Sequence, residues 1–81
     1  MFTVYVLHST KYDRLYIGQT KDIDRRLIEH NSGLSKSTKH YLPWKLIHTE
    51  VFNTRAEAMK REKELKTHAG RNSIRERYLQ N

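Results

Sequence analysis

Residues 2–18, Phe-Thr-Val-Tyr-Val-Leu-His-Ser-Thr-Lys-Tyr-Asp-Arg-Leu-Tyr-Ile-Gly, contain two short stretches whose side chains alternate in character. Alternation with a period of two is typical of β-strands, because successive side chains point to opposite faces of a sheet. The polar residues 9–12 separate the stretches 2–8 and 13–18. We therefore expect a β-hairpin over residues 2–18.

A four-residue loop fixes the register of this hairpin. The pairs expected from it are His8–Asp13, Val4–Ile17, Val6–Leu15 and Tyr5–Tyr16. One face is then wholly apolar, and the other carries two tyrosines side by side. A slip of one residue would move the apolar residues of the second strand onto the tyrosine face, which disfavours that register.

The rest of the chain supplies a third strand and several helices. The expected elements are a helix from about Asp22 to Asn31, a polar loop over 33–43, a strand over 44–52, a helix from the capping box Thr54–Glu57 to about Lys66, and a short helix from about Ser73 to Leu79. Strands and helices in this order indicate an α/β protein of the α+β type. We expect one domain over residues 1–81.

Composition narrows the class of partner. The chain has 81 residues, with 16 Lys and Arg against 9 Asp and Glu, giving a net charge of +7. Such an excess favours polyanions, although a merely soluble basic protein stays open. Without cysteine, disulfides, thiolate metal sites and cysteine nucleophiles are excluded. No apolar run approaches a membrane span, and the N-terminus lacks signal-peptide features, so we expect a cytoplasmic protein without membrane contact.

One carboxylate of the helix over 54–66 points inward. Relative to Ala58, Leu65 lies at about −20° and Glu62 at about +40°, so Glu62 falls inside the apolar sector. An inward carboxylate is costly unless a cation or a metal ion pairs with it. The structural alternative is an internal ion pair of Glu62 with Arg26 or Arg55.

Further polar residues accompany Glu62. Two tyrosines share one face of the hairpin, and Arg26 and His30 share one edge of the helix over 22–31, whose apolar face is Ile23 and Leu27. Alone, each is more often a packing or surface residue. Together they supply the parts for phosphodiester hydrolysis: a metal-binding carboxylate, a base for water and a cation to offset developing charge.

The pattern Val4-Tyr5-Val6, Tyr16-Ile17-Gly18, Arg26, His30 and Arg61-Glu62-Lys63 resembles the GIY-YIG nuclease domain over nearly the whole chain. It is most similar to the small single-domain bacterial members related to the N-terminal domain of the excision-repair nuclease. The resemblance implies a three-stranded antiparallel sheet flanked by helices. It also implies hydrolysis of DNA phosphodiester bonds with one divalent metal ion, Mg²⁺ or Mn²⁺.

The resemblance implies a catalytic role for each matched residue. Glu62 matches the metal ligand, and Arg26 matches the arginine that contacts the scissile phosphate. Tyr5 and Tyr16 match the motif tyrosines, one of which is proposed to activate water, and His30 matches the residue that orients a tyrosine or accepts its proton. Because phenols titrate near pH 10, a tyrosine base needs help from a nearby cation.

The sequence departs from the family pattern in two places. The first motif is Val-Tyr-Val, with Thr3 at the glycine position, a change that a strand tolerates. Many family members carry an asparagine near the C-terminal end, for which Asn72 is the candidate. Gly18 is the motif glycine, and we expect it to allow close approach of backbone or phosphate.

We therefore expect a divalent-metal-dependent endonuclease acting on DNA, structure-specific and linked to DNA repair or recombination. The alternatives are a non-catalytic nucleic-acid-binding module that keeps the fold, and a metal-free protein-interaction domain. No base-reading motif is visible, so we expect contacts to the DNA backbone with little sequence specificity. The candidate contacts are Gly18, Lys36, Lys39, Lys63, Lys66, Arg71 and Arg75.

Overall fold

The computed structural model describes residues 1–79 and forms an α+β fold around a three-stranded antiparallel sheet. The elements in chain order are β1 (Phe2–Ser9), β2 (Arg14–Thr20), α1 (Ile23–Asn31), the short 3₁₀ helix η1 (Lys39–Tyr41), β3 (Trp44–Phe52), α2 (Arg55–Lys66) and α3 (His68–Tyr78). The sheet order is β2-β1-β3, so the first strand is central. The predicted three-stranded sheet flanked by helices is confirmed. In residues 1–79, no helix is long and apolar enough to cross a membrane.

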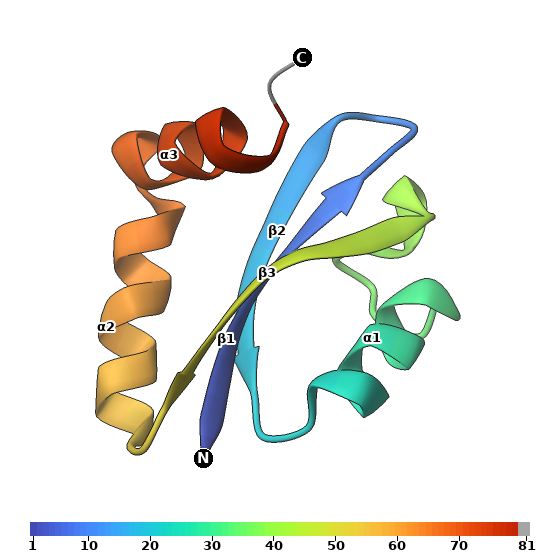
Figure 1. The fold of residues 1–81 in the computed structure, drawn as a ribbon. Helices are drawn as coiled ribbons and strands as arrows, with labels where there is room; N and C mark the ends of the chain where they lie inside the picture. Colours follow the sequence, from blue (N-terminus) through green and yellow to red (C-terminus); the bar gives the residue numbers. More distant parts are fainter. Residues whose placement is uncertain (80–81) are drawn as a thin grey trace.

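Helices cover both faces of the sheet (Figure 1). On one face, Val4, Val6 and Ile17 pack against side chains of α2 and α3, which include the buried Ala58 and Leu65. The other face carries a second cluster beneath α1 and η1. Its buried members are Tyr5, Leu7 and Trp44, with Tyr16, Ile23, Leu27, Tyr41, Leu42 and Leu46 packed around them. The central strand β1 therefore contributes to two cores.

The predicted register of the hairpin is wrong by two residues. The observed pairs are Tyr5–Gly18, Val6–Ile17, Leu7–Tyr16, His8–Leu15 and Ser9–Arg14. The turn lies one residue later than expected, because Asp13 takes a left-handed conformation (φ 52°) and its N–H bonds to the Ser9 carbonyl oxygen. A shift of two keeps every side chain on its face. The separation into an apolar face and a tyrosine face is therefore correct, although the two tyrosines are diagonal rather than opposite neighbours.

Side-chain caps define the helix starts. Asp22 accepts a hydrogen bond from the Arg25 N–H at the start of α1, and Thr54 accepts one from the Glu57 N–H at the start of α2. The last helix begins five residues earlier than the Ser73 expected from the sequence. Its cap is Thr67, which accepts a hydrogen bond from the Gly70 N–H. This threonine is the sequence signal that the prediction missed.

Helix α3 turns sharply away from the end of α2, and Gly70 makes this corner compact. A Cβ placed on Gly70 would meet the backbone of α2, including Glu64 O and, at 2.6 Å, Leu65 Cα. Backbone atoms cannot move aside as a flexible side chain can. The glycine is therefore required by close packing of the two helices, even though glycine disfavours helix.

We expect Gly70→Ala to destabilise the protein, although the same change in an open helix position stabilises by about 1 kcal/mol. The measurement is the free energy of unfolding in urea, with Ser73→Ala on the exposed side of the same helix as control. A stability gain for Gly70→Ala similar to a normal helix position would contradict the close packing of α2 and α3.

Candidate active site

The two motif tyrosines lie on the same face of the sheet. Their ring centroids are 6.2 Å apart, Tyr5 being buried in the central strand and Tyr16 half-buried on the edge strand. Gly18 lies opposite Tyr5 and leaves the space that the phenol occupies. A Cβ there would lie 2.8 Å from the Tyr5 hydroxyl oxygen and 3.2 Å from the Tyr16 ring. The glycine expected to admit phosphate or backbone is therefore needed first by the tyrosines themselves.

A buried chain of hydrogen bonds links Tyr5 to helix α1 and to the loop that follows it. The Tyr5 hydroxyl lies 2.9 Å from His30 Nε2, and His30 Nδ1 lies 2.8 Å from Thr38 Oγ1. Tyr5 is 1% exposed, while His30 and Thr38 are fully buried. The Trp44 indole N–H extends the chain to β3 by donating to the Thr38 carbonyl oxygen at 2.9 Å. Every buried polar side-chain atom in the described residues has a partner.

Burial sets the protonation state of this chain. Desolvation raises the pKa of Tyr5 to about 12, although the neighbouring Arg26 guanidinium opposes the shift. Desolvation also lowers the pKa of His30, and the positive charge of Arg26 lowers it further. At neutral pH, Tyr5 is therefore a protonated phenol bonded to a neutral imidazole, and the pair holds the aromatic cluster in place.

Arg26 brings a fixed positive charge to the tyrosines. Its Nη1 donates to Glu29 Oε1 at 2.9 Å, and its side chain is 36% exposed. This ion pair, together with Tyr5, raises the pKa of Arg26, so the guanidinium remains charged. The predicted edge of α1 therefore places one cation and one imidazole beside both phenols, and the His30 ring lies 4.9 Å from the Tyr16 ring.

Glu62 reaches this region from α2, and its negative charge contributes to the raised pKa of Tyr5. Its side chain is 19% exposed and pairs with Lys66 at 2.7 Å. The expected structural alternative, an ion pair with Arg26 or Arg55, is therefore wrong. Lys66 is half exposed and belongs to the same helix. A partner of this kind can leave the carboxylate when another cation arrives, at little cost in stability.

The donor set around Glu62 fits a weakly held hard cation. Among residues 1–79, no group of three or more His, Cys, Asp or Glu side chains is placed to hold a metal ion. A preformed metal cage in that part of the chain is thus excluded. Mg²⁺ does not need one, because it commonly binds through one or two carboxylates, water and substrate phosphates. Glu62 alone is consistent with such an ion.

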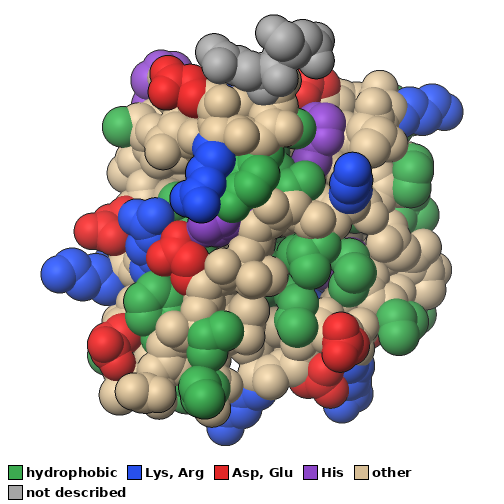
Figure 2. Space-filling model, viewed as in Figure 1, with side chains coloured by type: hydrophobic (Ala, Val, Ile, Leu, Met, Phe, Trp, Pro, Cys, Tyr) green, Lys and Arg blue, Asp and Glu red, His purple; other side chains and the backbone are tan. Residues whose placement is uncertain are grey.

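The predicted nucleic-acid contacts divide into exposed and anchored side chains. Lys36, Lys39 and Lys63 are exposed. Arg71 donates to the carbonyl oxygens of Lys66 and Leu15, at 3.2 and 3.4 Å. On the face with β3 in front, Lys and Arg side chains are interspersed with acidic ones (Figure 2).

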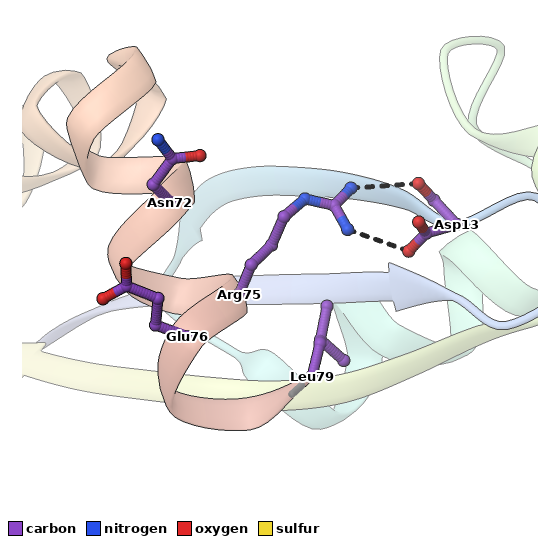
Figure 3. Close-up of a pocket in the computed structure, with 5 residues that line it drawn as sticks. All are labelled: Asp13, Asn72, Arg75, Glu76 and Leu79. Atoms are coloured by element: carbon purple, nitrogen blue, oxygen red, sulfur yellow. Dashed lines mark hydrogen bonds and ion pairs between the residues drawn. The ribbon is translucent and has the colours of Figure 1, made fainter. Parts of the chain in front are cut away.

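Arg75 reaches from α3 to the hairpin turn and holds Asp13 through two hydrogen bonds of 2.9 and 3.0 Å (Figure 3). Asn72, the candidate for the family's C-terminal asparagine, lines the same hollow and lies 3.2 Å from a ring nitrogen of His68. This hollow is at the hairpin end of β2, and Tyr5, Tyr16 and Glu62 are not among the residues that line it.

The sequence-based prediction missed Thr38 and Trp44. Thr38 lies in the polar loop 33–43, where nothing in the pattern separates it from neighbouring serines and threonines. Its role depends on burial, which the preceding helix and the 3₁₀ turn create. Trp44 begins the predicted third strand, and its indole N–H, the only one in the chain, needs an acceptor once the ring is buried.

The arrangement agrees with comparisons to known proteins. Residues 1–78 match the family profile described as the GIY-YIG catalytic domain. The chain belongs to the GIY-YIG family.

Two GIY-YIG relatives and a solved structure share most of its length. A UPF0213 protein of Staphylococcus saprophyticus is 45% identical over 79% of this chain and 78% of its own. A UPF0213 protein of Haloquadratum walsbyi is 41% identical over 80% and 73%. The solution NMR structure of a UPF0213 protein from Bacillus halodurans has a TM-score of 0.55 and 33% identity, covering 91% of this chain and 82% of that one. The predicted resemblance to a GIY-YIG nuclease domain is confirmed, and the chain is a member of a nuclease family.

We expect stability to fall as His30 becomes protonated. Because the folded pKa lies below the ordinary value of 6.5, the unfolded chain takes up the proton first. The contribution is complete above pH 6.5 and is lost as the pH falls from there toward the folded pKa. In urea unfolding over this range, His30→Gln should show a weaker pH dependence than wild type, whereas the exposed control His40→Gln should not. An unchanged slope in His30→Gln would contradict a buried neutral imidazole.

Proposed function

We propose that the chain is a divalent-metal-dependent endonuclease that hydrolyses DNA phosphodiester bonds, recognising the backbone and the shape of branched, flapped or damaged DNA. Residues 1–81 would act as one domain in the cytoplasm, in repair or recombination. One observation carries the proposal: a costly, fully satisfied buried chain positions Tyr5 beside Tyr16 and Arg26. A module that only binds DNA has no need of this construction.

The two tyrosines take different roles in this proposal. Tyr5 is buried, bonded to His30 and held as the neutral phenol by its raised pKa, so it positions its neighbours and donates hydrogen bonds. Tyr16 is half-buried and therefore accessible to water. We assign it the activation of the attacking water. Arg26, which interacts electrostatically with Tyr16, stabilises the phenolate that this requires and the charge on the scissile phosphate.

Glu62 is the residue that would hold the metal ion. The bound ion would supply Lewis-acid stabilisation of the phosphate charge. Before it binds, Lys66 neutralises the carboxylate, and afterwards the lysine is available for a phosphate. The exposed lysines Lys36, Lys39 and Lys63 supply further contacts without base readout. A second candidate function, a binding module without catalysis, is favoured only by the same Glu62–Lys66 pair, which satisfies the carboxylate without a metal.

We expect Glu62→Gln to lower the rate of cleavage by at least about 100-fold, because charge stabilisation by the metal is worth several kcal/mol. Unfolding stability should change by less than about 1 kcal/mol, since the partner is a half-exposed lysine. Cleavage of plasmid, single-stranded, flapped and branched DNA with Mg²⁺ or Mn²⁺ measures the first, and urea unfolding the second.

The matched control is Glu64→Gln, which removes an exposed carboxylate from the same helix and should cleave like wild type. Equal cleavage by Glu62→Gln and wild type would reject the metal assignment. If wild type binds all these DNAs and cleaves none with either metal, the binding-module function replaces the nuclease.

We expect Tyr16→Phe and Tyr5→Phe to separate chemistry from stability. Loss of a general base costs about 10²–10⁴ in rate, so Tyr16→Phe should nearly abolish cleavage while folding normally. Tyr5→Phe leaves His30 Nε2 without its partner, which should cost about 1–3 kcal/mol of stability. Cleavage assays and urea unfolding of both variants test this, and full activity of Tyr16→Phe would transfer the role of base to another group.

A further inference from the structure

A row of aromatic rings runs from the candidate active site to the hairpin end of the sheet. The rings of Tyr16 and Trp44 are 6.3 Å apart, those of Trp44 and Tyr41 6.5 Å, and those of Tyr41 and Tyr12 5.6 Å. Trp44 is buried and belongs to the core, whereas Tyr12 is 48% exposed. The row therefore begins beside the proposed base and ends on an accessible tyrosine at the hairpin turn.

Basic side chains surround the exposed end of this row. The Arg14 guanidinium carbon lies 4.5 Å above the Tyr41 ring, and Lys11 Nζ lies 5.6 Å from the centre of the Tyr12 ring. Arg71 and Arg75 line an open hollow with Tyr12 and Arg14. The one carboxylate of that hollow, Asp13, already pairs with His8 and Arg75. The local charge is thus positive.

Core packing does not account for Tyr12. Nearly half of its surface is exposed, and it touches the core only through the edge contact with Tyr41. Exposed aromatic rings among arginines are the means by which proteins bind unpaired nucleotides. Each ring stacks on a base of any identity, while the cations contact phosphates. An acidic protein segment would use the cations but has no need of a row of rings leading to the catalytic tyrosine.

We propose that the hairpin platform, defined as Tyr12, Tyr41, Lys11 and Arg14, binds an unpaired base of the DNA substrate. The proposal rests on the nuclease function, and it names the substrate class as duplex DNA that carries a single-stranded segment. On β2, Arg14, Tyr16 and Gly18 alternate along one face, so a strand that passes the platform continues directly to the tyrosines. The platform would thereby select junctions between single and double strands.

The test compares a blunt duplex with the same duplex carrying a single-stranded flap. Binding is measured by fluorescence anisotropy without divalent metal, so that no DNA is cut. We expect Tyr12→Ala to weaken binding of the flapped DNA by about 5-fold or more, as loss of one stacked base does, and to leave blunt-duplex affinity within about twofold. Tyr12→Phe should bind like wild type, and Tyr12→Trp should bind flapped DNA at least as tightly.

The matched control is Tyr78→Ala, which removes another partly exposed tyrosine that packs on His48, away from the aromatic row. It should leave both affinities unchanged. A second readout places 2-aminopurine at successive flap positions. One position should change fluorescence on binding to wild type and Tyr12→Phe, but not to Tyr12→Ala. Thermal melting checks that each variant folds.

Cleavage of the flapped DNA with Mg²⁺ is followed in parallel. If wild type cuts DNA and Tyr12→Ala binds and cuts flaps like wild type, the platform is rejected and the nuclease stands. If wild type binds flaps in a Tyr12-dependent way but cuts no DNA, the platform stands and the nuclease fails. Equal weakening of blunt and flapped DNA by Tyr12→Ala also rejects the platform. Absence of any DNA binding by wild type rejects both proposals.

Discussion

The buried hydrogen-bond chain Tyr5–His30–Thr38 is the constraint on which the rest of this fold depends. Phenol, imidazole and hydroxyl are all withdrawn from water, so each must find its partner inside the protein. Meeting that requirement fixes three segments at once: β1, helix α1 and the loop that carries Thr38. An arrangement in which α1 slid along the sheet would leave polar atoms unpaired at a cost of about 1–3 kcal/mol each.

The two faces of the sheet divide stability from function. The face under α2 and α3 is an ordinary apolar core of valine, isoleucine, leucine and alanine. The face under α1 is aromatic and polar, and much of its packing consists of rings that also bear hydroxyl or imidazole groups. Glu62 comes from the apolar side and lies near the edge strand β2, so the candidate site combines residues from both layers. A small domain with one sheet can assemble these groups only at an edge that both helical layers reach.

Hydrophobic alternation predicted the faces of the hairpin, the third strand and the first two helices, because those properties follow from period alone. The register was wrong because a shift of two residues leaves the alternation unchanged, and only the backbone of Asp13 decides it. The early start of α3 was missed because Gly70 lowers helix propensity, and packing against α2 compensates in a way no local pattern reveals. The positions of the site residues could be anticipated from spacing, whereas Lys66 as the partner of Glu62 and Thr38 as the partner of His30 required the fold.

The charges of the site are oriented by neighbours rather than left free. Glu29 holds Arg26, Lys66 holds Glu62, and Asp13 holds Arg75 at the hairpin end. Exposed pairs of this kind add little to stability, because solvent screens them and side-chain entropy opposes them. Their physical value is preorganisation: a guanidinium already in position loses less freedom when a phosphate binds. The buried chain can thus fix the geometry of the tyrosines while the partly exposed charges exchange partners, so the protein needs no rearrangement of its core to accept a polyanion.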